Sequence, residues 1–118
     1  MERLRFDADA AFAPGEVLLE RVTVAPLSAP FRLGSRIQAA VFRVAPNGKI
    51  ARHPATVPQI LAVLEGTGRV SGGDGQLEPI TAGEAVFWAA GEEHETESQT
   101  GLTALIIEAD GLQPWRTG

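Results

Sequence analysis

Short runs in which apolar and polar residues alternate, separated by turn residues, make up most of this sequence. The clearest runs are rich in Val, Ile, Leu, Phe or Thr and cover residues 36–44, 59–70, 76–80, 84–88, 94–98 and 102–108. The breaks between them contain Gly, Pro, Asn or Asp, which adopt the backbone conformations that tight turns require. Short strands at this spacing predict an all-β protein, either an antiparallel sandwich or a barrel.

The first 35 residues carry a weaker pattern. Residues 16–24 fit one or two turns of amphipathic helix, but their β-branched end, Val22-Thr23-Val24, favours a strand. Pro26 and Pro30 end whatever element precedes them. We therefore expect one structural domain in three parts: an irregular N-terminal arm over 1–35 that adds an edge strand, a barrel core over 36–110, and a tail over 111–118. In the tail, Trp115 is expected to pack against the barrel.

Composition narrows the class of protein. The chain has 118 residues, which is enough for one domain with its own core. The absence of cysteine excludes disulfides, thiolate metal sites and cysteine nucleophiles, and it suits a reducing cytosol. The N-terminal stretch mixes acidic with apolar residues and does not resemble a signal peptide, and no run reaches membrane-spanning length. These features predict a cytoplasmic protein without a membrane partner.

Charge argues against nucleic acid as a partner. The net charge is −5, and the basic residues are scattered along the chain instead of forming a stripe. Such a surface repels a phosphate backbone. The sequence also lacks a helix-turn-helix segment that could read DNA.

Strand alternation places polar side chains on inward rows of the predicted barrel. Residues two apart in a strand share a face, and one row of each strand in a small barrel points inward. Three such rows contain His53 with Ala55, Gln59 with Leu61 and Val63, and His94 with Thr96 and Ser98. The polar members His53, Gln59 and His94 are therefore predicted to converge. His53 and His94 are the only histidines in the chain.

These residues lie in two stretches that resemble the two motifs of the cupin superfamily. The first runs from Gly48 through His53, Ala55 and Gln59 to Gly66, and is similar to a pattern of Gly, His-x-His, Glu and Gly. The second runs from Gly83 through Gly91 and His94 to Ser98, and is similar to Gly-x5-Pro-x-Gly-x2-His-x3-Asn. The resemblance covers residues 36–109. It implies a single-domain jelly-roll β-barrel and a homodimer.

The departures from the family pattern concern the metal ligands. Metal-binding members usually supply three histidines and one glutamate, and the resemblance places His53 and His94 at two of these positions. Ala55 replaces a histidine, and Gln59 replaces the glutamate. Among nearby acids, Glu93 and Glu95 point away from His94 by alternation, and Glu92 lies in the turn. A divalent ion (Zn, Ni, Fe or Mn) could thus bind only through His53, Gln59 and His94, with a carboxamide as a poor third ligand.

Other features have simpler interpretations. The glycine-rich run 72–75 joins two strands and opens no helix, so it is not a phosphate loop. The acidic run 91–95 is interpreted as a solvated rim with one inward histidine. Phe87 and Trp88 lie on opposite faces, so one should line the interior while the other packs outside, against the arm or a second subunit. A second subunit could also cover the apolar run 17–19.

We expect a small polar molecule to bind in the barrel, with metal binding weak or absent. The predicted pocket is lined by His53, Ala55, Gln59, Leu61, His94 and Thr96. One alternative is a metal-dependent enzyme, an oxygenase, isomerase or lyase that acts on a small organic acid or carbonyl compound. Another is an accessory protein with a vestigial pocket, in which the histidines are relics held by hydrogen bonds. Fold alone does not choose among these functions.

Overall fold

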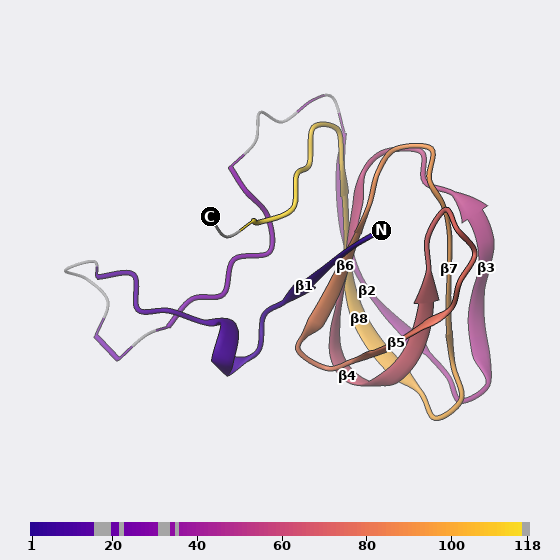
Figure 1. The fold of residues 1–118 in the computed structure, drawn as a ribbon, viewed down its shortest axis with the longest axis horizontal. Helices are drawn as coiled ribbons and strands as arrows, with labels where there is room; N and C mark the ends of the chain where they lie inside the picture. The colour runs from indigo at the N-terminus through magenta and orange to yellow at the C-terminus, as the bar shows by residue number, and fades with distance from the viewer. Residues whose placement is uncertain (16–19, 22, 31–33, 35, 117–118) are drawn as a thin grey trace.

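Figure 1 shows the computed structural model, which describes residues 1–15, 20–21, 23–30, 34 and 36–116. Its strands, in chain order, are β1 (Glu2–Arg5), β2 (Ile37–Val44), β3 (Gly48–Pro54), β4 (Gln59–Ser71), β5 (Glu78–Thr81), β6 (Glu84–Trp88), β7 (Glu93–Ser98) and β8 (Leu102–Ala109). A single turn of 3-10 helix, η1 (Ala8–Ala10), follows β1, and the Asp7 side chain caps it by accepting a hydrogen bond from the Ala10 amide. All strand pairs are antiparallel, which confirms the all-β prediction.

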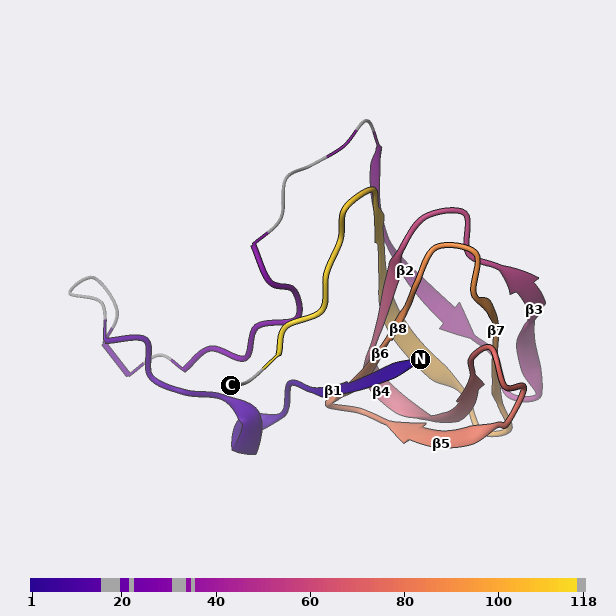
Figure 2. The same ribbon diagram turned by 45° about the horizontal axis from the view of Figure 1, so that its top comes forward.

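The strands form two curved sheets that share β4. The first half of β4 lies between β6 and β8, with β1 beyond β6 and β2 beyond β8. The second half pairs with β5 and β7, and β3 pairs with β7. Figure 2 shows how these two sheets curl toward each other into a jelly-roll barrel. We call them the β6–β4–β8 sheet and the β4–β7–β3 sheet.

The strands predicted within the core occur close to the expected bounds. Glycines at positive φ mark several of the turns between them; Gly83, for example, has a φ of 89° and joins β5 to β6. β1 and β3 are not among the clearest alternating runs, although the sequence places His53 and Ala55 on one side of an extended segment. β1 is only four residues long, too short for a visible period. β3 contains polar residues on both faces and a bulge between Ile50 and His53, which interrupts the period.

Side chains pack on both faces of the β6–β4–β8 sheet. The core inside the barrel includes Leu61, Val86, Trp88 and Ile106. A second cluster, built on Ile60, Ala62, Phe87 and Leu112, lies on the outer face, where Phe6 and Leu27 pack against it. Trp88 is therefore the interior member of the Phe87-Trp88 pair, and Phe87 packs outside under residues of the first 35. This agrees with the prediction from alternation.

The arm and the tail lie together beside the barrel (Figures 1 and 2). Isolated bridges join Phe12 to Val24 and Ser28 to Pro114, and the Trp115 amide donates to the Leu27 carbonyl. The edge strand predicted for the N-terminal segment is present, but it is β1 at the start of the chain. The strand expected over 16–24 and the apolar run 17–19 fall largely on residues outside those described.

β2 is the most exposed strand of the barrel. It pairs only with β8, and Ile37, Val41 and Phe42 are exposed although they are large and apolar. None of the helices in the described part of the chain is long and apolar enough to cross a membrane.

Candidate functional site

The two histidines lie directly opposite each other on neighbouring strands. His53 of β3 and His94 of β7 are Cα partners, and the centroids of their rings are 4.4 Å apart. The bulge that precedes His53 sets its position on β3. Within that bulge, Arg52 donates to the Ser71 hydroxyl and to the Gly72 carbonyl, which ties β3 to the end of β4. The predicted pairing of the histidines is therefore present in the structure.

Each imidazole is oriented by a backbone carbonyl on its own strand or turn. His53 Nδ1 lies 2.7 Å from the Ala51 carbonyl oxygen, and His94 Nδ1 lies 3.1 Å from the Glu92 carbonyl oxygen. A carbonyl oxygen only accepts, so Nδ1 carries the hydrogen in both rings. In the neutral rings, Nε2 is then left as a hydrogen-bond acceptor or metal ligand.

Trp88 supports His94 from the β6–β4–β8 sheet. Its ring stacks on that of His94 with a centroid distance of 4.4 Å, and its Nε1 donates to the Ser71 carbonyl at 3.1 Å. Trp88 is 1% exposed and belongs to the inner core. It therefore fixes the plane of His94 from within the barrel.

Burial favours the neutral form of His94. It is 3% exposed, and burial lowers the pKa of His94 below its ordinary value of 6.5. The hydrogen bond to the Glu92 carbonyl opposes this shift without cancelling it, and the nearby His53 lowers the pKa further. His53 is exposed, so the pair has one ring inside the barrel and one at its opening.

Gln59 faces the histidines from the other sheet. It begins β4 and is the Cα partner of both Trp88 and Glu108. The sequence predicts that Gln59 converges with the histidines, but Gln59 does not lie on a strand segment paired with that of His94, because β4 reaches β7 only through residues 69–71. Instead, Gln59 lies beside Trp88, whose indole stacks on His94. Gln59 is 6% exposed.

The remaining predicted lining residues, Ala55, Leu61 and Thr96, are buried. Ala55 follows β3, where its amide donates to the Glu92 carbonyl and its own carbonyl accepts from Gly91. It is buried, and its backbone joins this loop to the turn before β7. Leu61 packs in the inner core, and Thr96, opposite Ile50, is equally buried.

Glu92 corrects the prediction of a solvated acidic rim. Its carboxylate accepts hydrogen bonds from the amides of Gly73 and Ala89 and from the Met1 ammonium. Burial disfavours its ionised form, but these donors outweigh burial and hold the pKa of Glu92 below its ordinary value. The Glu92 side chain thus stabilises the turn in which its own backbone carbonyl orients His94.

Sequence reasoning missed one acid, Glu108. The search for a carboxylate considered only the neighbours of His94. Residues Leu102, Ala104 and Ile106 alternate into the inner core, and Glu108 continues this row at the end of β8. Its charge raises the pKa of His94, although less than burial lowers it. Extending the alternation along β8 would have identified Glu108.

The described donors do not fit a metal ion held by protein ligands alone. His53 and His94 offer two Nε2 atoms, but Ala55 has no donor and Gln59 offers only a neutral carboxamide. Within the described ranges, no group of three or more His, Cys, Asp or Glu side chains is arranged to hold a metal. By donor chemistry, the family's four-ligand set is incomplete in this chain.

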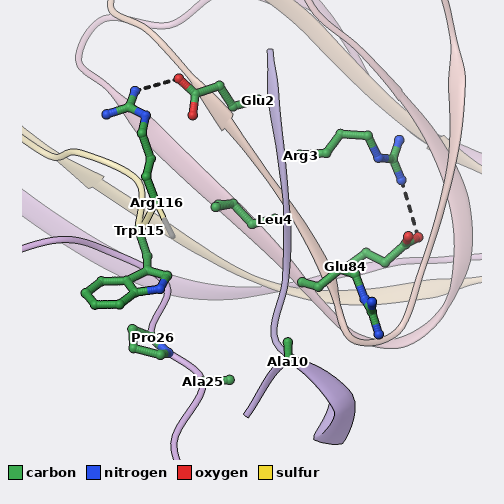
Figure 3. Close-up of a pocket in the computed structure, with 10 residues that line it drawn as sticks. Glu2, Arg3, Leu4, Ala10, Ala25, Pro26, Glu84, Trp115 and Arg116 are labelled. Atoms are coloured by element: carbon green, nitrogen blue, oxygen red, sulfur yellow. Dashed lines mark hydrogen bonds and ion pairs between the residues drawn. The ribbon is translucent and has the colours of Figure 1, made fainter. Parts of the chain in front are cut away.

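A cleft of about 710 Å³ lies elsewhere, between β1, the arm and the tail. Figure 3 shows its lining, which includes Leu4 and Trp115. Its charged groups are paired: Arg116 donates to Glu2 at 2.6 Å and Arg3 to Glu84 at 3.3 Å. The cleft has room for a ligand, but these charged side chains already pair with one another.

Comparisons with known proteins agree with this fold. The chain is similar to the structure of a cupin superfamily protein from Desulfitobacterium hafniense, with 17% identity, a TM-score of 0.60, and coverage of 71% of this chain and 76% of that chain. A predicted oxalate decarboxylase from Thermotoga maritima shows 25% identity and a TM-score of 0.55, over 65% of each chain. The polyketide cyclase RemF from Streptomyces resistomycificus shows 25% identity and a TM-score of 0.57, over 72% of this chain and 64% of that chain.

The comparison with curated proteins gave no significant match. A family model described as a cupin domain matches residues 40–108, a stretch that contains the histidine pair, Gln59 and Glu108. Since this match spans more than half of the chain, the chain belongs to the cupin family.

Proposed function

We propose that this cupin binds a small polar molecule at the end of the barrel where His53 and His94 meet Gln59, without a metal held by protein ligands alone. The observation that carries the proposal is the orientation of the two imidazoles. Both Nδ1 atoms bond to backbone carbonyls, so both Nε2 atoms are left to accept from something else.

Burial of polar groups supports the same proposal. Gln59 and His94 are polar side chains on the buried inner face. The Gln59 amide forms no side-chain hydrogen bond with a described residue, and no fully buried side-chain polar atom of the described residues lacks a partner, so the amide is open to a small molecule or to solvent. A bound molecule with donors and acceptors would satisfy Gln59 together with the Nε2 atoms.

Two of the similar structures support a small-molecule role. One is titled a predicted oxalate decarboxylase and another a polyketide cyclase, so this fold serves small organic compounds in those proteins. These likenesses favour binding of an organic molecule between the sheets. They do not select a reaction for this chain, whose ligand set differs from the family's pattern.

Thermal-shift screening against a metabolite library tests the proposal. A ligand that binds the folded state stabilises it by RT ln(1 + [L]/Kd), which is about 2.7 kcal/mol at a hundred times Kd. We expect stabilisation by at least one class of polar compound, and its loss in His53→Ala and in His94→Gln. His53 is exposed, so His53→Ala should fold normally. Glu65→Gln, an exposed acid at the far end of β4's first half, is the matched control.

Metal analysis of the same proteins separates binding from metal-dependent catalysis. We expect sub-stoichiometric metal in untagged protein purified without chelator. Stoichiometric metal that disappears in both histidine variants would instead support the metal-dependent enzyme. Stabilisation that persists unchanged in both histidine variants would rule out this site as the binding site.

A further inference from the structure

An acidic residue, Glu108, lies on the inner face beside Gln59, and the proposed function does not explain its role. In the register of the β6–β4–β8 sheet, Gln38, Glu108, Gln59 and Trp88 are successive Cα partners across β2, β8, β4 and β6. Directly opposite residues project from the same face of a sheet. Trp88 points inward and stacks on His94, so Glu108 projects from the face that Trp88 and Gln59 share.

Alternation along β8 gives the same orientation for Glu108. Ile106 belongs to the inner core, whereas Leu105 and Ile107 pack against the outer cluster. Glu108 is two residues beyond Ile106 and therefore inward. It is partly buried, which brings its carboxylate to the opening of the barrel and not to the outer surface.

Glu108 has no counter-charge in the described part of the chain. Its carboxylate forms no ion pair or side-chain hydrogen bond with a described residue, in contrast to Glu92, which binds three N–H donors. Arg36, exposed just before β2, forms no ion pair with Glu108. Its row neighbours Gln38, Gln59 and Trp88 carry no charge.

The side chains that face this region are dominated by acceptors. The Nδ1 atoms of His53 and His94 bond to backbone carbonyls, which leaves Nε2 of each ring to face a ligand. Glu108 adds two anionic oxygens, and Gln59 adds one carbonyl oxygen together with its two N–H donors. A ligand complementary to such a set donates hydrogen bonds and is positively charged. An organic acid would instead face the Glu108 charge.

We propose that Glu108 is the charge-recognition residue of this site, and that the ligand is a small organic ammonium compound. This inference rests on the proposed function and specifies its ligand class. The ammonium group pairs with Glu108 and donates toward the Nε2 acceptors, while Gln59 binds the neutral polar part of the molecule. Metal binding is not needed for this recognition.

Three probes of nearly equal size test the charge directly: ethanolamine (as ethanolammonium), ethylene glycol and glycolate. They share a hydroxymethyl group and differ in carrying a positive, a zero or a negative charge. In amide NMR titrations of the full chain, ethanolammonium should bind about tenfold more tightly than ethylene glycol, and glycolate least tightly. The shifted amides should cluster around β8, β3 and the start of β4.

Glu108→Gln should abolish this preference, so that ethanolammonium and ethylene glycol bind alike, whereas Glu65→Gln should leave it unchanged. Glu108→Asp retains the charge and should preserve the order of the probes. Because Glu108 lacks a partner, Glu108→Gln should also keep or raise the Tm of the ligand-free protein, which excludes unfolding as the cause of lost binding.

Several results would overturn the inference. These are equal binding of the three probes, tighter binding of glycolate, no binding of ethanolammonium, or an unchanged preference in Glu108→Gln. Zn²⁺ binding that requires both His94 and Glu108 and excludes ethanolammonium would identify a metal as the occupant instead. The proposed function would survive each of these if the library screen still gives a ligand that depends on His53 and His94. The proposed function itself would fail if no compound in the library screen depended on the histidines for binding.

Discussion

The opening of the barrel and the cleft between β1 and the tail differ in how their polar groups are satisfied. In the cleft, Arg116 pairs with Glu2 and Arg3 with Glu84, so these side chains stabilise the protein's own structure. At the barrel opening, Glu108 and the histidine Nε2 atoms face one region without a cation among the described residues. The difference teaches that an inward charge without an ion-pair partner indicates a binding site better than empty volume does.

The largest expected loss of stability comes from a substitution inside the barrel. Trp88→Ala removes a buried indole, its stacking on His94 and its hydrogen bond to the Ser71 carbonyl. We expect a loss of about 3–5 kcal/mol in the free energy of unfolding. On the cleft side, Trp115 is only partly buried, and Trp115→Ala should cost about 1–2 kcal/mol. Urea denaturation measures both, and equal costs would contradict the contrast.

An intermediate effect concerns pH. The folded-state pKa of His94 lies below its unfolded value, so the unfolded chain binds more protons in this range. The contribution of His94 is therefore complete above a pH of about 6.5 and is lost as the pH falls through its folded-state pKa. Denaturation of the wild type and of His94→Gln across this range should give a difference that shrinks on acidification. A difference independent of pH would show that His94 is not held neutral.

The smallest expected effect comes from the cleft. Arg116 and Glu2 form an exposed ion pair, and such pairs contribute little because water and salt screen them. Arg116→Ala should leave the denaturation midpoint and ligand binding at the histidine pair within experimental error. Both the midpoint and ligand binding should be measured, because a change in ligand binding would show that the cleft and the barrel site are coupled.

Alternation along single strands predicted the fold and half of the site. It gave the core strands, the placement of Phe87 and Trp88 on opposite faces, and the inward rows that contain His53 and His94, because these follow from the local period and the turn residues. It missed β1, whose four residues show no period, and β3, whose bulge breaks the period. It also missed the true neighbours of Gln59, because register between distant strands is a property of the folded sheet.

For Glu108, the orientation could be predicted from the sequence, but the neighbours could not. Its inward orientation follows from the period of β8 alone, which the sequence displays. Its proximity to Gln59 depends on the β4–β8 register, which the sequence does not display. Glu92 is a second example, because its three N–H donors come from separate turns and from the N-terminus.

The orientation of the two imidazoles has an evolutionary consequence. Each ring is held by the carbonyl two residues before it, at Ala51 and at Glu92, and any amino acid supplies such a carbonyl. The histidine pair can therefore keep its geometry while the side chains around it change, as at Ala55 and Gln59. A lineage can exchange the remaining ligands and acquire a new substrate without rebuilding the pair, and the same freedom is open to protein engineers.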